Sequence, residues 1–486
     1  MQIALKESQL GLRNSTTRLP FRYGNVCLSS CPQAVLQVTL EVDGQLAHGY
    51  SGDCLPPGWF DKSPEKNYAQ QIDDMLEISA YAQQVFLEEF THPTKFFPVW
   101  LAASGRIHEW AHGQNFTPLL ASFGASLIER AMIDAMARAA QISFHQLVRE
   151  NLLEIEPGQV HRQLRSHSIN QWLPSKPTTS IFVRHTVGLA DPLTAVDIPV
   201  EERLDDGFPQ SLEEYLAQSS ICYLKVKVSN QLDNDIGRLL TIAALVEKHR
   251  GNHYSITLDG NEQYHQAYEF DHLIESIHSQ SNLATLLANT LVIEQPLARN
   301  IALDEKQTAG VRQLAKTIPV IIDESDGTLN SYPEAIELGY RGVSSKNCKG
   351  TIKSLLNCGL TWLHNDQGQR TDYVMTGEDL CSVGVIPVQA DLCLAATLGL
   401  THIERNGHHY HPGLNYLSPV EQQAALAAHG DFYAFQHDRV VPQVIDGQFQ
   451  IGSLQCHGFG FAALPDMKSM QSSDQWQYKS LGLAAR

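Results

Sequence analysis

Hydrophobic and polar residues alternate near the start of the chain, and helical patterns follow. Residues 35–42, VLQVTLEV, alternate with a period of two, and the Asp43-Gly44 pair after them is typical of a hairpin turn. We therefore expect strands and turns over residues 1–60. Apolar residues at helical spacing predict helices over 66–90 and 117–150.

From about residue 180, short apolar segments alternate with longer helical patterns. The apolar segments begin near residues 181, 222, 254, 290, 318 and 341, and two more candidates lie at 373–376 and 400–404. Strands that alternate with helices indicate a parallel sheet, and eight such units suit a (β/α)8-type barrel. The predicted fold class is therefore α/β, with the active site at the carboxyl ends of the barrel strands. Residues 407–486 carry no clear pattern.

Composition excludes several kinds of protein. The chain has 486 residues, 43% of them hydrophobic, with a net charge of −18 and no basic block, so no nucleic-acid partner is expected. Its nine cysteines form no CxxC pair, which argues against a disulfide framework or a structural zinc site. No apolar run is long enough to span a membrane. We expect a cytoplasmic protein without a membrane partner.

Three carboxylates each end a predicted strand: Asp259, Glu294 and Asp323, spaced 35 and 29 residues apart. The ends of barrel strands converge on one axis, where three carboxylates would repel one another unless a cation lay between them. Hard oxygen ligands favour Mg²⁺. For any one of these residues alone, a helix cap is an equally good interpretation.

Lysines belong to the same pattern. Lys225 and Lys227 alternate with apolar residues in CYLKVKV, so both point to one face of a strand, and Lys346 follows the sixth strand. A lysine near other cations is pushed toward its neutral form and can act as a base. A divalent ion facing two lysines is an arrangement for removing a proton next to a carboxylate. We expect Lys225 to support the carboxylates.

The motifs KVKV, LDGN, IEQP, IDES and SSKNCKG, in that order, resemble the enolase superfamily. The nearest branch is the muconate-lactonizing and dipeptide-epimerase branch of the mandelate racemase/muconate-lactonizing enzyme-like members. The helix FGASLIERAMIDAMARA resembles the one that joins the family's capping domain to its barrel. The resemblance covers most of residues 35–410. It implies an N-terminal α+β capping domain over 1–150, a barrel over 151–420, and a C-terminal segment, 421–486, that returns to the capping domain.

The resemblance also implies roles for individual residues. Lys227 and Lys346 would be the two acid/base catalysts, and Asp259, Glu294 and Asp323 would bind one Mg²⁺. The loop at 49–60 would close over the substrate. The residues expected to bind substrate or support the site are Lys225, Asn261, His185, Lys349, Glu378, Asp379, Glu404 and Trp59.

Some positions depart from the family's pattern. Its sixth-strand motif commonly runs Lys-x-x-Lys-x-Gly-Gly, but here it is Lys346-Asn-Cys-Lys349-Gly350-Thr351, with a glycine lost, so the choice between Lys346 and Lys349 stays open, with Lys346 favoured. Glu378-Asp379 and Glu404 do not match the usual ends of the seventh and eighth strands. We therefore expect a substrate that these branches do not use. The spacer at 360–372 is a further insertion that could line the mouth of the barrel, and the sequence leaves its role open.

The sequence therefore predicts an isomerase or lyase that forms an enediolate from a small carboxylate: a racemase or epimerase, a dehydratase or a cycloisomerase. Members of this family usually form homo-oligomers. One alternative is a non-catalytic binding protein with this fold, although all five expected functional residues are present. Another is a zinc-dependent barrel hydrolase using His185, His364 and His408-His409, although no His-x-His pair ends a strand.

Overall fold

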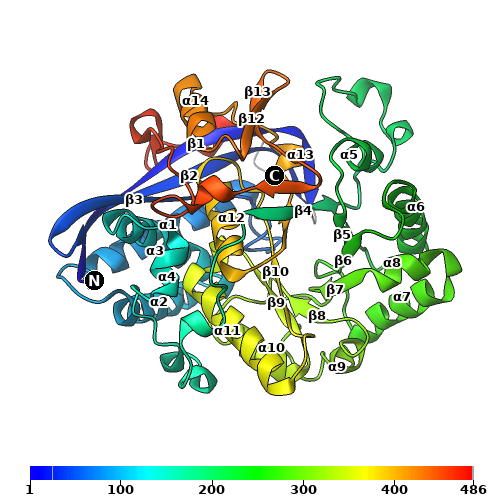
Figure 1. Cartoon of the computed structure of the whole chain (residues 1–486), viewed down its shortest axis with the longest axis horizontal. Helices are drawn as coiled ribbons and strands as arrows, with labels where there is room; N and C mark the ends of the chain where they lie inside the picture. The colour runs from blue at the N-terminus through cyan, green and yellow to red at the C-terminus, as the bar shows by residue number, and fades with distance from the viewer. Residues whose placement is uncertain (24–25, 484–486) are drawn as a thin grey trace.

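The computed structural model describes residues 1–23 and 26–483. Figure 1 shows the blue and cyan N-terminal elements on one side of the molecule and the green barrel units on the other. Eight parallel strands form the barrel, which closes because His402–Arg405 of the last strand pairs with Phe182–His185 of the first. The strands are β4 (Ser180–Val187), β5 (Tyr223–Lys227), β6 (Ser255–Asp259), β7 (Thr290–Glu294), β8 (Val320–Ile322), β9 (Gly342–Ser345), β10 (Val374–Gly377) and β11 (His402–Arg405).

These strands confirm the predicted barrel. Ile256 and Leu258 of β6 and all three residues of β8 are fully buried, as expected for parallel strands covered on both faces. The helices between the strands are α5 (Leu212–Gln218), α6 (Leu232–Arg250), α7 (Ala267–Ser279), α8 (Ala284–Ala288), α9 (Val311–Leu314), α10 (Ser331–Leu338), α11 (Thr351–Gly368) and α12 (Ile386–Leu398). The spacer at 360–372 does not line the mouth, because its first part is the end of α11, which lies on the outside of the barrel.

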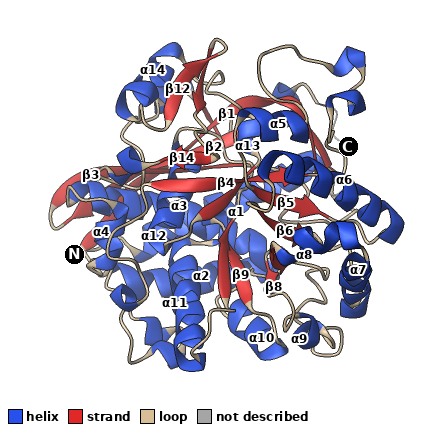
Figure 2. Ribbon diagram, turned by 45° about the vertical axis from the view of Figure 1, so that its right-hand side comes forward, coloured by secondary structure: helices blue, strands red, loops and turns tan. Residues whose placement is uncertain are grey.

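The capping domain contains an antiparallel sheet and three long helices, as Figure 2 shows. The sheet has the order β15–β1–β2–β3, and Asp43 and Gly44 both have positive φ at the β2–β3 turn, which confirms the predicted hairpin. The elements are β1 (Ile3–Tyr23), β2 (Val26–Val42), β3 (Gln45–Cys54), β15 (Gln471–Ser472), α1 (Tyr68–Glu89), α2 (Phe96–Gly113), α3 (Pro118–Ala139) and α4 (Phe144–Arg149).

The expected loop at 49–60 is shorter than the sequence indicated, because residues 49–54 belong to β3. Glycine is needed at position 49 for packing, since a Cβ there would lie 2.1 Å from the carbonyl oxygen of Ala131 in α3. Only the segment after Cys54 is a loop.

Helix α3 connects the two domains. Its Glu129 accepts hydrogen bonds from Trp100 Nε1 (2.6 Å) in the capping domain and from the backbone N–H of Thr351 (2.6 Å) in the barrel. Asp134 and Arg138 form an i,i+4 ion pair at 2.7 Å. Because 19 of its residues are buried, α3 belongs to the hydrophobic core of both domains and is not an exposed linker.

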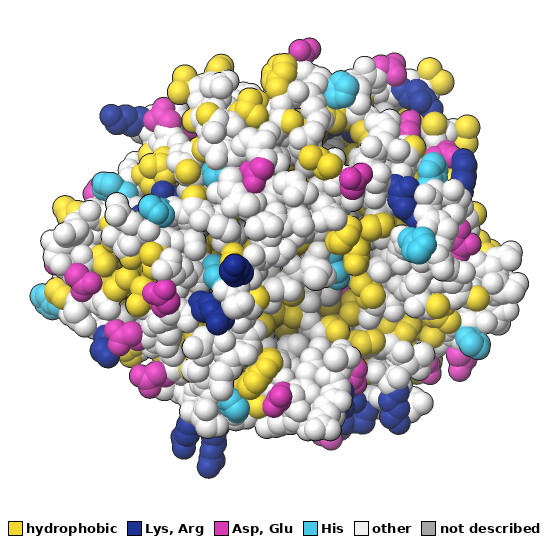
Figure 3. Space-filling model, in the orientation of Figure 1, with side chains coloured by type: hydrophobic (Ala, Val, Ile, Leu, Met, Phe, Trp, Pro, Cys, Tyr) yellow, Lys and Arg dark blue, Asp and Glu magenta, His cyan; other side chains and the backbone are white. Residues whose placement is uncertain are grey.

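The C-terminal residues reach both domains. The antiparallel strand β14 pairs with β4, and β15 pairs with β1. The remaining elements are α13 (Gly407–Tyr410), α14 (Pro419–Ala428), β12 (Tyr433–Gln436), β13 (Arg439–Pro442) and β14 (Gln448–Gln450). Within the described residues, no helix is both long and apolar enough to cross a membrane. On the face shown in Figure 3, acidic and basic side chains are dispersed.

Candidate active site

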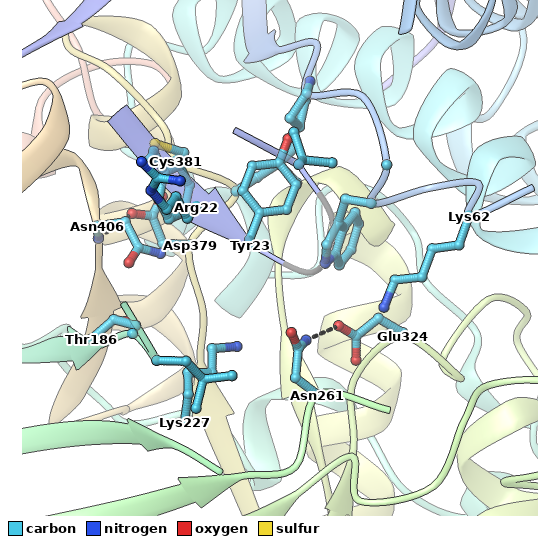
Figure 4. A pocket seen from close by; sticks show the side chains of 18 of the residues that line it. Arg22, Tyr23, Lys62, Thr186, Lys227, Asn261, Glu324, Asp379, Cys381 and Asn406 are labelled. Carbon is cyan, nitrogen blue, oxygen red and sulfur yellow. Dashed lines mark hydrogen bonds between the residues drawn. The ribbon is translucent and has the colours of Figure 1, made fainter. Parts of the chain in front are cut away.

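A cavity of about 690 Å³ lies at the carboxyl ends of the barrel strands, and the capping domain forms part of its wall. Figure 4 shows Lys227 and Asn261 on the barrel side and Tyr23 and Lys62 on the capping side. This volume falls in the usual range for small-molecule sites. The position at the carboxyl ends of the strands is the one expected for the active site of a (β/α)8 barrel.

Lys225 lies at the centre of a buried group of carboxylates. Its Nζ is 2.8 Å from Glu294 Oε1, 2.8 Å from Glu378 Oε2, 3.1 Å from Glu404 Oε2 and 3.1 Å from Asp259 Oδ2. Burial alone would lower the pKa of Lys225, but these carboxylates raise it well above its usual value. Lys225 is therefore a fixed ammonium that holds four acidic side chains together.

Lys227 and Lys346 lie on opposite walls of the cavity, because β5 is the second of the eight barrel strands and β9, just before Lys346, is the sixth. Lys227 Nζ is 2.5 Å from Asp259 Oδ2, and Lys346 Nζ is 2.7 Å from Asp323 Oδ2. Burial opposes the charge on each lysine, but the neighbouring carboxylate raises the pKa of both. The sequence predicted that one of these lysines would be neutral, but this arrangement favours the charged ammonium form of both.

The three predicted metal ligands end adjacent strands. Glu294 Oε1 accepts from Lys225, while its buried Oε2 has no hydrogen-bond partner in the described part of the chain. Burial and the neighbouring Asp259 and Glu378 raise the pKa of Glu294 well above its usual value. Burial has the same tendency at Asp323, but Lys346 and Lys349 hold its pKa well below the usual range.

Whether these residues fit a metal ion depends on the donor set and its charge. Among the described residues, no three His, Cys, Asp or Glu side chains are grouped so that they could hold a metal ion. Lysine ammonium groups instead lie against Asp259, Glu294 and Asp323. The chemistry of the donors nevertheless fits Mg²⁺, because all three are carboxylates and Glu294 retains an unsatisfied buried oxygen.

Lys346 and Lys349 have different surroundings. Lys346 lines the cavity, and its Nζ lies 4.3 Å from the centroid of the Trp59 ring. Lys349 is 2% exposed and donates to the backbone oxygen of Ser344 (2.8 Å) and to Asp323 Oδ1 (3.1 Å). Lys346 is therefore the lysine that can meet a ligand, and Lys349 orients Asp323 from behind.

The other predicted site residues divide between the cavity wall and the layer behind it. Asn261, Asp379, Glu404 and Trp59 line the cavity. Glu378 is fully enclosed and pairs with Arg184 as well as Lys225.

His185 does not line the cavity. Its Nδ1 lies 2.9 Å from Nε2 of His408, and its ring packs on Tyr215 at 4.5 Å. His364 stacks on Tyr373 in another part of the structure. The histidines of the zinc alternative are thus divided between two places.

Several wall residues were not singled out from the sequence, among them Glu324, Arg22 and Tyr23. Glu324 directly follows Asp323, and burial together with Asp323 raises its pKa to about 7. The position of Glu324 in the IDES motif, next to the strand-end carboxylate Asp323, could have identified it as a site residue from the sequence. Arg22 and Tyr23 lie more than 200 residues from the barrel motifs, so no local pattern connects them with the site.

No family model matches the chain, and no curated protein matches it in sequence. Solved structures do match along nearly the whole length. Muconate lactonizing enzyme from Pseudomonas fluorescens, complexed with muconolactone, has a TM-score of 0.59 at 15% identity over 96% of this chain and 97% of that one. Dipeptide epimerase from Enterococcus faecalis V583, complexed with Mg and the dipeptide L-Leu-L-Tyr, has a TM-score of 0.57 at 15% identity, covering 95% and 99%. An enolase from Bradyrhizobium, complexed with magnesium and mandelic acid, has a TM-score of 0.56 at 14% identity, covering 95% and 96%.

These matches confirm the predicted fold class. The chain has the fold of the mandelate racemase/muconate-lactonizing enzyme-like members of the enolase superfamily: a (β/α)8 barrel with an N-terminal capping domain.

Proposed function

We propose that the protein is a Mg²⁺-dependent isomerase or lyase that removes the proton α to a carboxylate of a small organic acid. The observation that carries this proposal is the placement of Lys227 and Lys346 on opposite walls of one cavity. Each lysine lies against an aspartate of a carboxylate set that ends three successive strands. Structures with the same fold contain magnesium together with small carboxylic acids.

The chain's own residues would divide the work. Asp259, Glu294 and Asp323 would hold the metal ion. When bound, Mg²⁺ would stabilise negative charge on the substrate carboxylate. One lysine would take the α-proton, and the other would stabilise the enediolate or return a proton from the opposite face. Lys225 would keep the carboxylates in place, and Trp59 would exclude water above Lys346.

The overall reaction is left open between racemisation or epimerisation, cycloisomerisation and dehydration, because all begin with the same proton abstraction. The substrate class is a small carboxylate. A fold shared at this level of identity does not choose among these reactions.

Calorimetric titration with Mg²⁺ tests the metal site directly. We expect one site in the metal-free wild-type protein, and in Glu294→Gln a loss of affinity of at least about 100-fold, because a neutral amide replaces an anionic ligand. Deuterium exchange at the α-carbon of a panel of carboxylic acids in D₂O then tests the chemistry. Exchange that requires both Mg²⁺ and the lysines supports the proposal.

Other outcomes would contradict it. Binding of carboxylic acids with no exchange by any of them would favour a non-catalytic binding protein. A strong preference for Zn²⁺ over Mg²⁺ would favour a hydrolase.

A further inference from the structure

Two cysteines meet behind the wall that the capping domain contributes to the cavity. Cys31 in β2 and Cys54 at the end of β3 are fully buried, and their Sγ atoms lie 3.0 Å apart. A disulfide requires a separation of about 2.05 Å, so the two sulfurs need only a small approach to bond. They belong to a small apolar cluster with Val26 and Leu28, separate from the main core.

The pair lies where two segments of the cavity wall diverge. The last residue pair of the β2–β3 ladder is Gln33 and Cys54. Just beyond it, the backbone N–H of Leu55 donates a final hydrogen bond to the carbonyl oxygen of Pro32 (3.0 Å). Beyond this point β1 and β2 continue as an arm, made up of the described residues 16–23 and 26–30, and among these residues each strand forms its ladder with the other.

Both diverging segments reach the substrate cavity. The arm contributes Phe21, Arg22 and Tyr23 to the wall, while the segment that leaves β3 contributes Pro56 and Trp59. A bond between Cys31 and Cys54 would therefore join the bases of both wall segments.

We propose that Cys31 and Cys54 are a modification site. A small peroxide oxidises the two thiols to an intramolecular disulfide, which fixes the arm against the segment that carries Trp59. One thiol sulfur takes an oxygen from hydrogen peroxide and becomes a sulfenic acid, releasing one water. The second sulfur displaces that oxygen as another water. In total, two S–H bonds and the O–O bond break, one S–S bond and two O–H bonds form, and two electrons pass from the sulfurs to the peroxide, whose oxygens leave as two waters.

The residues around the two cysteines determine how fast they are oxidised and how an oxidant reaches them. The hydrogen bond with Cys31 and burial raise the pKa of the Cys54 thiol, so oxidation is slow at neutral pH and accelerates as the pH rises. Val26 and Tyr23 pack around the pair and also line the cavity, which gives a small oxidant a short way in. Larger disulfide reagents lack such access, because both cysteines are fully buried.

Peptide mapping tests the disulfide independently of any catalytic activity. The full-length protein, with the exposed Cys27 replaced in a Cys27→Ser background, is treated with hydrogen peroxide at pH 8.5 and then denatured and alkylated without reduction. After digestion that cleaves at Glu41, which lies between the two cysteines, we expect a cross-linked peptide pair containing Cys31 and Cys54, about 2 Da lighter than the sum of the separate peptides, and its loss on treatment with dithiothreitol. Cys31→Ser should abolish it, and the matched variant Cys358→Ser should retain it.

Limited trypsin digestion tests the effect on the arm. Arg22 is exposed and has no carboxylate partner among the described residues, so cleavage after it reports local opening of the arm. We expect oxidation to slow this cleavage about tenfold, and reduction to restore it. The proposal is overturned if Cys31 and Cys54 stay reduced while partly exposed Cys358 is oxidised, or if the disulfide forms and cleavage at Arg22 is unchanged.

Discussion

Lys346 of the barrel lies beneath Trp59 of the capping domain, with its Nζ 4.3 Å from the centroid of the indole ring. The two residues are 287 positions apart in the chain. Trp59 is only 8% exposed and also packs edge-on against Phe60. The contact places an aromatic face over one of the two proposed catalytic lysines, so the capping domain contributes directly to its environment.

Removing this aromatic face should weaken catalysis without unfolding the protein. Cation–π contacts of this kind contribute about 0.5–2 kcal/mol. We expect Trp59→Leu to lower kcat/KM about tenfold, and Trp59→Phe to retain most of it, because a smaller ring keeps the interaction. Steady-state kinetics of both variants checks this. Equal losses in the two variants would indicate that Trp59 only fills space.

Each proposed catalytic lysine should be required for proton exchange. General acid–base groups contribute about 10²–10⁴-fold, so we expect Lys227→Ala and Lys346→Ala to reduce α-deuterium exchange by at least 100-fold. Exchange followed by NMR, together with thermal unfolding of each variant, separates lost chemistry from lost structure. Full activity in either folded variant would rule out the two-lysine mechanism.

Lys225 should matter chiefly for stability. Without its ammonium, Asp259, Glu294, Glu378 and Glu404 lose their common counter-charge. We expect Lys225→Met to lower the free energy of unfolding by about 3–5 kcal/mol, as when one partner of a buried ion pair is removed. Urea unfolding measures this change.

The exposed Lys248 provides the control. Its Nζ lies 2.7 Å from Glu213 Oε1, but 63% of the Lys248 side chain is exposed. Lys248→Met should change the free energy of unfolding by less than about 1 kcal/mol. Similar effects of the two substitutions would contradict the central role of Lys225.

Glu129 should make stability depend on pH. Burial raises the pKa of Glu129 to about 7, so the folded protein holds its proton more tightly than the unfolded chain does. The protein therefore loses stability as pH rises from about 4.5 through 7, by on the order of 3 kcal/mol. Glu129→Gln keeps an oxygen acceptor for Thr351 and should remove this contribution. Urea unfolding of both proteins across that pH range checks it, and parallel profiles would refute it.

Local sequence patterns determined the barrel and the chemistry at its strand ends. The period-two alternation in β2, the Asp43-Gly44 turn and eight apolar segments followed by helical patterns each follow from short-range geometry. The carboxyl ends of barrel strands converge around one axis, so charged residues at several strand ends can meet there. The sequence alone could therefore gather Lys227, Asp259 and Lys346 into one candidate site.

Only the tertiary structure decided which of these side chains meet the cavity. Lys346 and Lys349 are three residues apart in one motif, and the fold places Lys346 under Trp59 and buries Lys349 against Ser344. His185 and Thr186 are neighbours near the end of β4, yet Thr186 lines the cavity while the ring of His185 packs on Tyr215 outside it. Contacts between distant segments depend on how whole domains pack, and no periodicity within a segment records that packing.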